Sequence, residues 1–162
     1  MMSEEKNMKA ALNVYETICQ MFDDMDFKYD RHDEDMVVTC TVRGEDFPME
    51  ILFFVHADRE IVQLLSPLPF HINEDKRSDA AVAVAVANYG LVNGSFDYDM
   101  SDGEIRFRAT QAYMDSILGK EIFRYMLAAV TSSVDKYNDR FFMLNKGMMT
   151  VEQFIEMENT EE

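Results

Sequence analysis

Between Glu4 and Asp26, apolar residues recur at steps of three and four positions. The repeating apolar residues are Met8, Ala11, Leu12, Tyr15, Ile18, Cys19, Phe22 and Met25. Because an α-helix turns once in about 3.6 residues, this spacing gathers them on one face. Ser3 can cap the start of the helix, and Glu4 and Glu5 suit the positive end of its dipole. The pattern predicts an amphipathic N-terminal helix.

Beyond residue 26 the apolar positions begin to alternate, which is typical of β-strands. Four strands are predicted, over residues 27–30, 36–43, 49–56 and 61–66. The third strand places Phe53 on one face and Phe54 on the other, and the fourth is also apolar on both faces. Such strands lie at the centre of sheets that are covered on both sides. We expect Pro67 and Pro69 to end the sheet, because proline has no N–H to donate.

The segment Asp79–Leu91 carries two conflicting signals. Valines at 82, 84 and 86 alternate strictly with alanines, which by itself is a strand pattern. Alanine, however, is the strongest helix former and is depleted in strands. Asn73 or Ser78 can cap a helix here, and Gly90 can end it. We therefore predict a helix whose small alanines allow close packing against the sheet.

Residues 95–100 and 104–110 predict a β-hairpin that turns at Asp102-Gly103, a favoured two-residue turn. The expected cross-strand pairs are Asp97–Arg108 and Asp99–Arg106 on one face, and Phe96–Ala109, Tyr98–Phe107 and Met100–Ile105 on the other. One face is apolar and the other pairs opposite charges, so turn and pattern agree.

Helical spacing returns over Gly119–Asn145, followed by Lys146-Gly147, which suits a helix end. We predict one domain over residues 1–147, with residues 148–162 forming an acidic C-terminal tail or a short helix. The predicted fold class is α+β: an antiparallel sheet with flanking helices, in the order α-β(3-4)-α-β(2)-α.

The charge balance narrows the classes of partner. The chain has 31 acidic and 15 basic side chains among 162 residues, giving a net charge of −16. Such a field repels nucleic acid and anionic membrane, so we expect neither as a partner. The acidic N-terminus does not resemble a secretory signal, and Cys19 and Cys40 each sit in an apolar pattern as small buried hydrophobes. A cytoplasmic location is expected.

Candidate catalytic and metal-binding residues do not form a known arrangement. His32, His56 and His71 share no metal-ligand spacing, and none adjoins a nucleophile motif. The stretch Asp97–Ile105 is acidic, but placing Gly103 at the sixth position of a calcium loop puts Tyr98 at the first ligand position. We expect no metal or other cofactor, and a protein that is not an enzyme.

Methionine is unusually frequent, with 14 residues. Several methionines lie late in the chain, and we take Met143, Met148 and Met149 as candidate partner-binding residues. Flexible, polarizable methionine side chains suit surfaces that adapt to a partner. Gap-filling in the core remains the alternative reading.

Three stretches resemble one family. They are Val62-Gln63-Leu64-Leu65-Ser66-Pro67-Leu68-Pro69, Asn88-Tyr89-Gly90-Leu91-Val92-Asn93-Gly94-Ser95-Phe96, and Asp102-Gly103-Glu104-Ile105-Arg106-Phe107-Arg108. Their order resembles the YbjN-like family, described as bacterial sensory transduction regulators. The resemblance implies a fold similar to the type III secretion chaperones, small acidic proteins that often dimerise and hold an extended partner segment. It implies no catalytic residues.

These observations favour a non-enzymatic protein-binding or regulatory module, chaperone-like or acting in bacterial signal transduction. The alternative is a small-molecule sensor domain with a pocket between sheet and helices. The sequence does not identify the protein partner. Because both faces of the central strands are apolar, the helices either divide between the faces or leave one face for a second subunit. We expect a homodimer.

Overall fold

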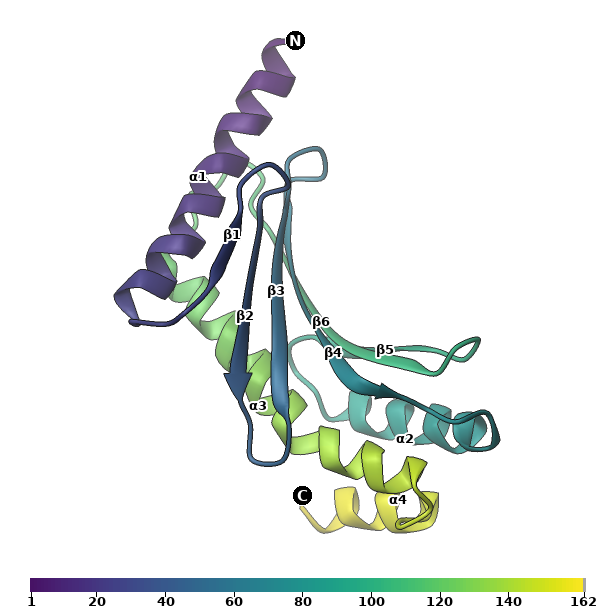
Figure 1. Cartoon of the computed structure of the whole chain (residues 1–162). Helices are drawn as coiled ribbons and strands as arrows, with labels where there is room; N and C mark the ends of the chain where they lie inside the picture. Colours follow the sequence, from purple (N-terminus) through teal and green to yellow (C-terminus); the bar gives the residue numbers. More distant parts are fainter. Residues whose placement is uncertain (162) are drawn as a thin grey trace.

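The computed structural model describes residues 1–161, which contain both α-helices and β-strands (Figure 1). Its α-helices are α1 (Met2–Asp24), α2 (Arg77–Tyr89), α3 (Lys120–Asn145) and α4 (Val151–Thr160). Its strands are β1 (Asp30–His32), β2 (Val37–Arg43), β3 (Pro48–His56), β4 (Ile61–His71), β5 (Ser95–Asp99) and β6 (Glu104–Ala112). The predicted α+β class and the order of helices and strands are confirmed.

The strands form one antiparallel sheet in the order β1-β2-β3-β4-β6-β5. The first four strands follow each other as a meander. The chain then leaves the sheet through α2 and returns at the far edge with β5. As a result β6, not β5, pairs with β4, and the hairpin continues the sheet away from the meander (Figure 1).

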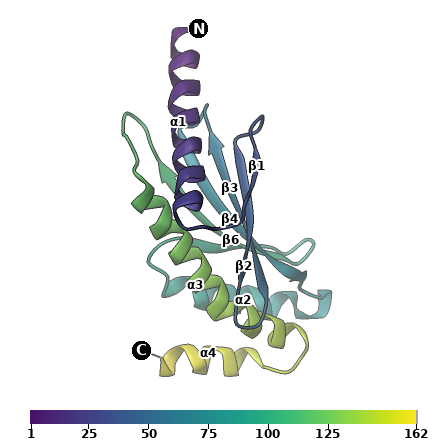
Figure 2. The ribbon, with the colours of Figure 1, turned by 60° about the vertical axis from the view of Figure 1, so that its left-hand side comes forward.

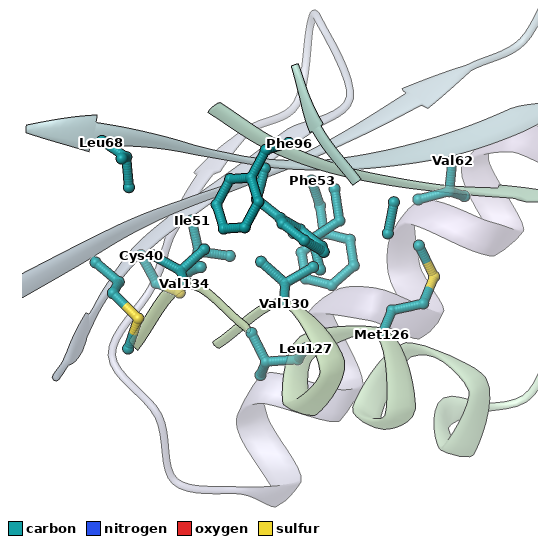
Figure 3. Packing of buried hydrophobic residues seen from close by; sticks show 14 of the residues in the cluster. Cys40, Ile51, Phe53, Val62, Leu68, Phe96, Met126, Leu127, Val130 and Val134 are labelled. Atoms are coloured by element: carbon teal, nitrogen blue, oxygen red, sulfur yellow. The ribbon is translucent and has the colours of Figure 1, made fainter. Parts of the chain in front are cut away.

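The helices gather on one face of the sheet (Figure 2). α1 and α3 pack against the central strands, α2 packs against β5, and α4 packs against α2 and α3. The core lies between this helical layer and the sheet, where Phe53 and Phe96 from strands approach Leu127 and Val130 of α3 (Figure 3). Within residues 1–161, no helix covers the opposite face.

Of the two arrangements that the sequence allows, the helices of the described residues adopt the second: they gather on one face of the sheet and leave the other without a helix. Ile51, Phe53 and Val55 are buried, but Leu52 and Phe54 between them are only half-buried. Periodicity shows that both faces are apolar, but it does not show whether a helix is available to cover each one.

Two boundaries near the N-terminus also differ from expectation. α1 begins at Met2, and Met1, not Ser3, is its first flanking residue, without a side-chain cap. The first strand is Asp30–His32 instead of residues 27–30. Residues after α1 close the turn locally, since the Phe27 N–H donates to the Phe22 carbonyl, which delays entry into the sheet.

The prolines do not end the sheet, contrary to expectation. β4 continues through Pro67 and Pro69 to His71. The described pairing of β4 with β3 ends at Leu65, and beyond it the strand pairs with β6. A proline is tolerated where one side of a strand has no ladder to complete, and the register shift after Pro67 absorbs the irregularity.

The alanine-rich segment is a helix, as predicted. A 3₁₀ turn at Glu74–Lys76 leads into α2, and Lys76, not Asn73 or Ser78, precedes its first residue. Ala80, Ala83, Val84 and Ala87 are buried. The small side chains allow α2 to lie close to β5, where both amide atoms of Asn88 hydrogen-bond the backbone of Phe96.

The predicted two-residue turn and register of the hairpin are wrong. Residues 100–103 form a four-residue loop, and Asp97 faces Arg106 instead of Arg108. The shift is two positions, so the apolar side chains stay on the helix-covered face. Asp97 nevertheless bonds both arginines, Arg106 at 3.4 Å and Arg108 at 3.0 Å, whereas the expected Asp99–Arg106 pair does not form.

Candidate protein-binding surface

The face of the sheet that lacks helices, called the open face below, combines apolar and polar side chains. Its half-buried apolar members are Val37, Leu52, Phe54, Ile61 and Leu65. Adjacent strands place Leu52 directly beside Leu65 and Val37 beside Phe54. Their side chains share the outward direction, opposite to that of the buried Phe53 and Leu64.

Polar groups frame this apolar row. Across it, Arg108 lies beside Leu65 and Gln63 beside Phe54. The Gln63 Oε1 atom lies 3.0 Å from His56 Nε2, and the His56 ring stacks over Phe54 with centroids 6.4 Å apart. The open face thus offers apolar contact in the middle and hydrogen-bonding groups at the sides, as protein interfaces commonly do.

A second apolar surface, called the α2 band, lies on the outer side of α2, the loop after it and the adjoining part of α3, and comprises Val82, Tyr89, Val92 and Tyr125. Tyr89 and Val92 are 91% and 100% exposed, and Val82 and Tyr125 are also exposed. The band borders a groove of about 580 Å³ between α2 and α4 and one of about 440 Å³ between residues 91–93 and α3. Exposed tyrosines within an apolar patch are typical of interaction surfaces.

The three predicted methionines differ in position. Met148 is 70% exposed, Met149 is buried, and Met143 packs half-buried against the core. Met148 and Met149 line a hollow of about 450 Å³ together with Met157. The structure thus brings two of the three together, and their role in binding a partner stays a prediction.

Sequence reasoning missed Tyr89, Val92 and the outward valines of α2. Once the segment is helical, Val82 falls on the face opposite Ala80 and Ala87, so a helical projection of Asp79–Leu91 carries the signal. The strand-like alternation concealed this second apolar face.

The buried side chains of Cys19, Cys40 and Tyr113 are in their neutral forms. Burial raises the pKa of the Cys19 and Cys40 thiols to about 11, so both are protonated at neutral pH and weakly nucleophilic. Burial also raises the pKa of Tyr113, whose hydroxyl donates to the His56 carbonyl. Across residues 1–161, no group of three or more His, Cys, Asp or Glu side chains is arranged to hold a metal ion.

In the described part of the chain, no helix is both long and apolar enough to cross a bilayer.

The histidines are dispersed: His32 is exposed on edge strand β1, His56 ends β3, and His71 ends β4.

Solved structures share this fold at low sequence identity. The HopA1–SchA chaperone–effector complex contains a chain that matches with a TM-score of 0.58 and 11% identity, covering 81% of this chain and 97% of that one. YbjN from E. coli, described as a putative transcription regulator, matches with a TM-score of 0.56, 12% identity and coverage of 78% and 92%. The ExsC–ExsE complex gives a TM-score of 0.53, 14% identity and coverage of 78% and 91%.

The type III secretion chaperone-like fold is therefore confirmed. No curated protein sequence matches the chain significantly. The model of the family YbjN, described as "Putative bacterial sensory transduction regulator", matches residues 15–143. This span runs from the middle of α1 to near the end of α3 and includes all six strands. The chain belongs to the YbjN family.

Proposed function

We propose that this chain is a cytoplasmic protein-binding module that holds a partner segment on the open face, as a chaperone or as a regulator in bacterial signalling. The observation that carries the proposal is the uncovered apolar row of Leu52, Phe54 and Leu65 on strands at the centre of the sheet. Central strands are normally covered, and full burial of a large apolar side chain is worth about 1.5–3 kcal/mol, part of which each of these half-buried side chains forgoes. A partner recovers that free energy.

The comparisons support this reading. Two chains of similar fold were solved in complexes, one described as a chaperone with its effector. Fold similarity alone gives weak support for function, so the main support is the chemistry of the surface.

The sensor hypothesis lacks comparable support. The space between sheet and helices is filled by Phe22, Phe53 and Phe123, whose rings pack edge to face. The grooves described above lie outside this packed core and open to the surface.

We further propose a homodimer formed through the α2 band. Tyr89, Val92 and Tyr125 are exposed on helices or directly beside them, and two copies of one patch can meet about a two-fold axis. This arrangement leaves the open face of each subunit available to a partner.

The decisive experiment compares capture of partners from a bacterial lysate by matched variants. Leu52→Ser combined with Leu65→Ser removes the apolar row, and Ile117→Ser removes a 91% exposed side chain from the loop before α3 as a control. We expect the same partner to be captured by the unmodified chain and by Ile117→Ser and lost from the double variant, with unchanged circular dichroism in all three. Capture by the double variant at the unmodified level would overturn the assignment of the open face.

A further inference from the structure

The outer side of α3 has an apolar site that α4 fills with a single aromatic ring. Phe154 is fully buried and is the buried residue of α4. Its ring stacks on Phe141 and Tyr137 of α3, with centroids 5.5 and 6.3 Å apart. Phe154 is thus the fully buried anchor of α4, while Val151 and Met157 add half-buried contacts with the core.

Beside this aromatic contact lies a cationic site, although the chain as a whole carries a charge of −16. Arg140 donates to Glu158 at 2.8 Å and to Glu161 at 2.5 Å. Lys136 reaches Glu161 at 3.0 Å, and the Tyr137 hydroxyl donates to Glu158 at 2.7 Å. Two carboxylates, Glu158 of α4 and Glu161 directly after it, thus pair with two cations of α3.

Several features set α4 apart from the rest of the fold. It follows Gly147, whose φ is +72°, and starts independently through a capping box between Thr150 and Gln153. Grooves of about 580 and 450 Å³ lie beside it. It also lies beyond residues 15–143, the span that the family model matches.

The receptor side on α3 is nevertheless fully built. With α4 docked, the Arg140 side chain is only 11% exposed, and its guanidinium pairs with Glu158 and Glu161. When α4 leaves, Arg140 and Lys136 lose these carboxylates and face solvent beside the ring surface that Phe154 covered. The vacated face of α3 therefore combines two cations with an apolar surface, which an acidic amphipathic helix complements.

The spacing on α4 defines the chemistry of the occupant. Phe154, Glu158 and Glu161 stand at i, i+4 and i+7, which places them on one side of a helix. We propose that the α3 face formed by Lys136, Tyr137, Arg140 and Phe141 is a docking site for acidic amphipathic helices with this spacing, and that α4 is a displaceable occupant. The inference rests on the proposed function as a protein-binding module, but it uses a surface separate from the open face.

The test uses the full chain with its own α4 weakened. Phe154→Ala, Glu158→Gln and Glu161→Gln together weaken the contacts that this segment makes with the α3 site and leave the side chains of α3 unchanged. The probe is a fluorescent peptide with the unmodified sequence of residues 148–161. We expect it to bind the triple variant at least about tenfold more tightly than the unmodified chain, because α4 no longer competes.

Two controls separate this site from nonspecific binding. Adding Arg140→Gln to the triple variant is expected to abolish peptide binding, and a probe with alanine in place of Phe154 is expected not to bind. If the triple variant loses its circular dichroism, Glu158→Gln with Glu161→Gln provides the same comparison in a milder form.

Equal peptide affinity for the unmodified and weakened chains, or binding that survives Arg140→Gln, would overturn the proposal. A one-to-one complex between an unmodified chain and a triple-variant chain would support the site and identify the helix of a second copy as the partner. Because Leu52 and Leu65 are unchanged in these variants, failure here leaves the open-face experiment unaffected.

Discussion

Asp99 shows how one side chain can change the register of a hairpin. Its carboxylate accepts hydrogen bonds from the backbone N–H and the hydroxyl of Ser101, at 2.8 and 2.6 Å. These bonds lower the pKa of Asp99 and hold the loop open at four residues. The Gly103 N–H, at φ +83°, donates to the Asp99 carbonyl, and the Gly103 carbonyl accepts a hydrogen bond from the Ile72 N–H. The Asp-Gly pair signals a turn, but the competing bonds of Asp99 decide its length.

Gly103→Ala is expected to destabilise the chain by more than about 1 kcal/mol. A side chain there is strained at positive φ, and its Cβ would overlap the backbone carbonyl of Ile72. Gly90→Ala is the matched control, because Gly90 has φ at −88° and no atom within 4 Å of the new Cβ. Urea denaturation of both variants checks the difference, and equal midpoints would contradict this account of the loop.

Residue pairing on the hairpin could be predicted only in part. The alternation of Phe96 and Tyr98 with Asp97 and Asp99 correctly predicts which face is apolar, because a shift of two positions preserves the faces. The individual pairs depend on loop length, which the local bonds of Asp99 determine. The alternation therefore predicts which face of the hairpin is apolar, but not which residues pair across the two strands.

For the second helix, too, the sequence predicts some features and leaves others undetermined. Alanine content correctly predicted that Arg77–Tyr89 is helical against a strand-like alternation, because propensity acts on every residue of the segment. The continuation of β4 through Pro67 and Pro69 was not predictable, since it depends on which neighbouring strand ends first. Whether a segment is a helix or a strand follows from its local sequence, whereas the residue at which it ends depends on the neighbouring strands and helices.

Ala83→Leu is expected to destabilise the chain by about 1–3 kcal/mol, because Ala83 is fully buried in α2 and a larger side chain forces the helix away from the sheet. Ala85→Leu, on the exposed side of the same helix, is the control, with an expected change within about 0.5 kcal/mol. Thermal unfolding of the two variants measures the difference, and similar losses in both would argue against close packing of α2.

Docking of α4 is expected to weaken in acid. Hydrogen bonds from Arg140 and then Lys136 lower the pKa of Glu161 from 4.5 to about 2. A lowered folded-state pKa stabilises the docked helix above pH 4.5, and this contribution is lost as the pH falls towards about 2. NMR signals of the Phe154 ring are expected to shift within this window. Glu161→Gln should remove the Glu161 contribution, and an unchanged profile in that variant would contradict it.

At the scale of the whole molecule, the sequence predicts the fold class and family but not the position of the candidate site. Both faces of β3 are apolar in sequence, and a covered face cannot be distinguished from an open one until the helices are placed. α1 and α3 contact each other and the central strands, so they share one core on one face of the sheet. The open face therefore depends on the topology of the chain, and the spacing of apolar residues in the sequence does not predict it.

The dimer is the prediction that concerns the whole molecule. Tyr89, Val92 and Tyr125 expose large side chains, and each gains about 1.5–3 kcal/mol on burial. The charge of −16 on each copy opposes association, so we expect dimerisation to strengthen as salt screens the repulsion. A stable interface should bury at least about 1,000 Å² in total.

Sedimentation equilibrium at tens of micromolar protein is expected to give a dimer for the unmodified chain and a monomer for Tyr89→Ser with Val92→Ser. Leu52→Ser with Leu65→Ser is the matched control, because it changes two apolar residues on the open face, which this interface does not use. If that control becomes a monomer while the α2-band variant remains a dimer, the second subunit sits on the open face instead. A monomer for the unmodified chain, at low and at moderate salt, would remove the dimer altogether, and the open face would then bind its partner from a single subunit.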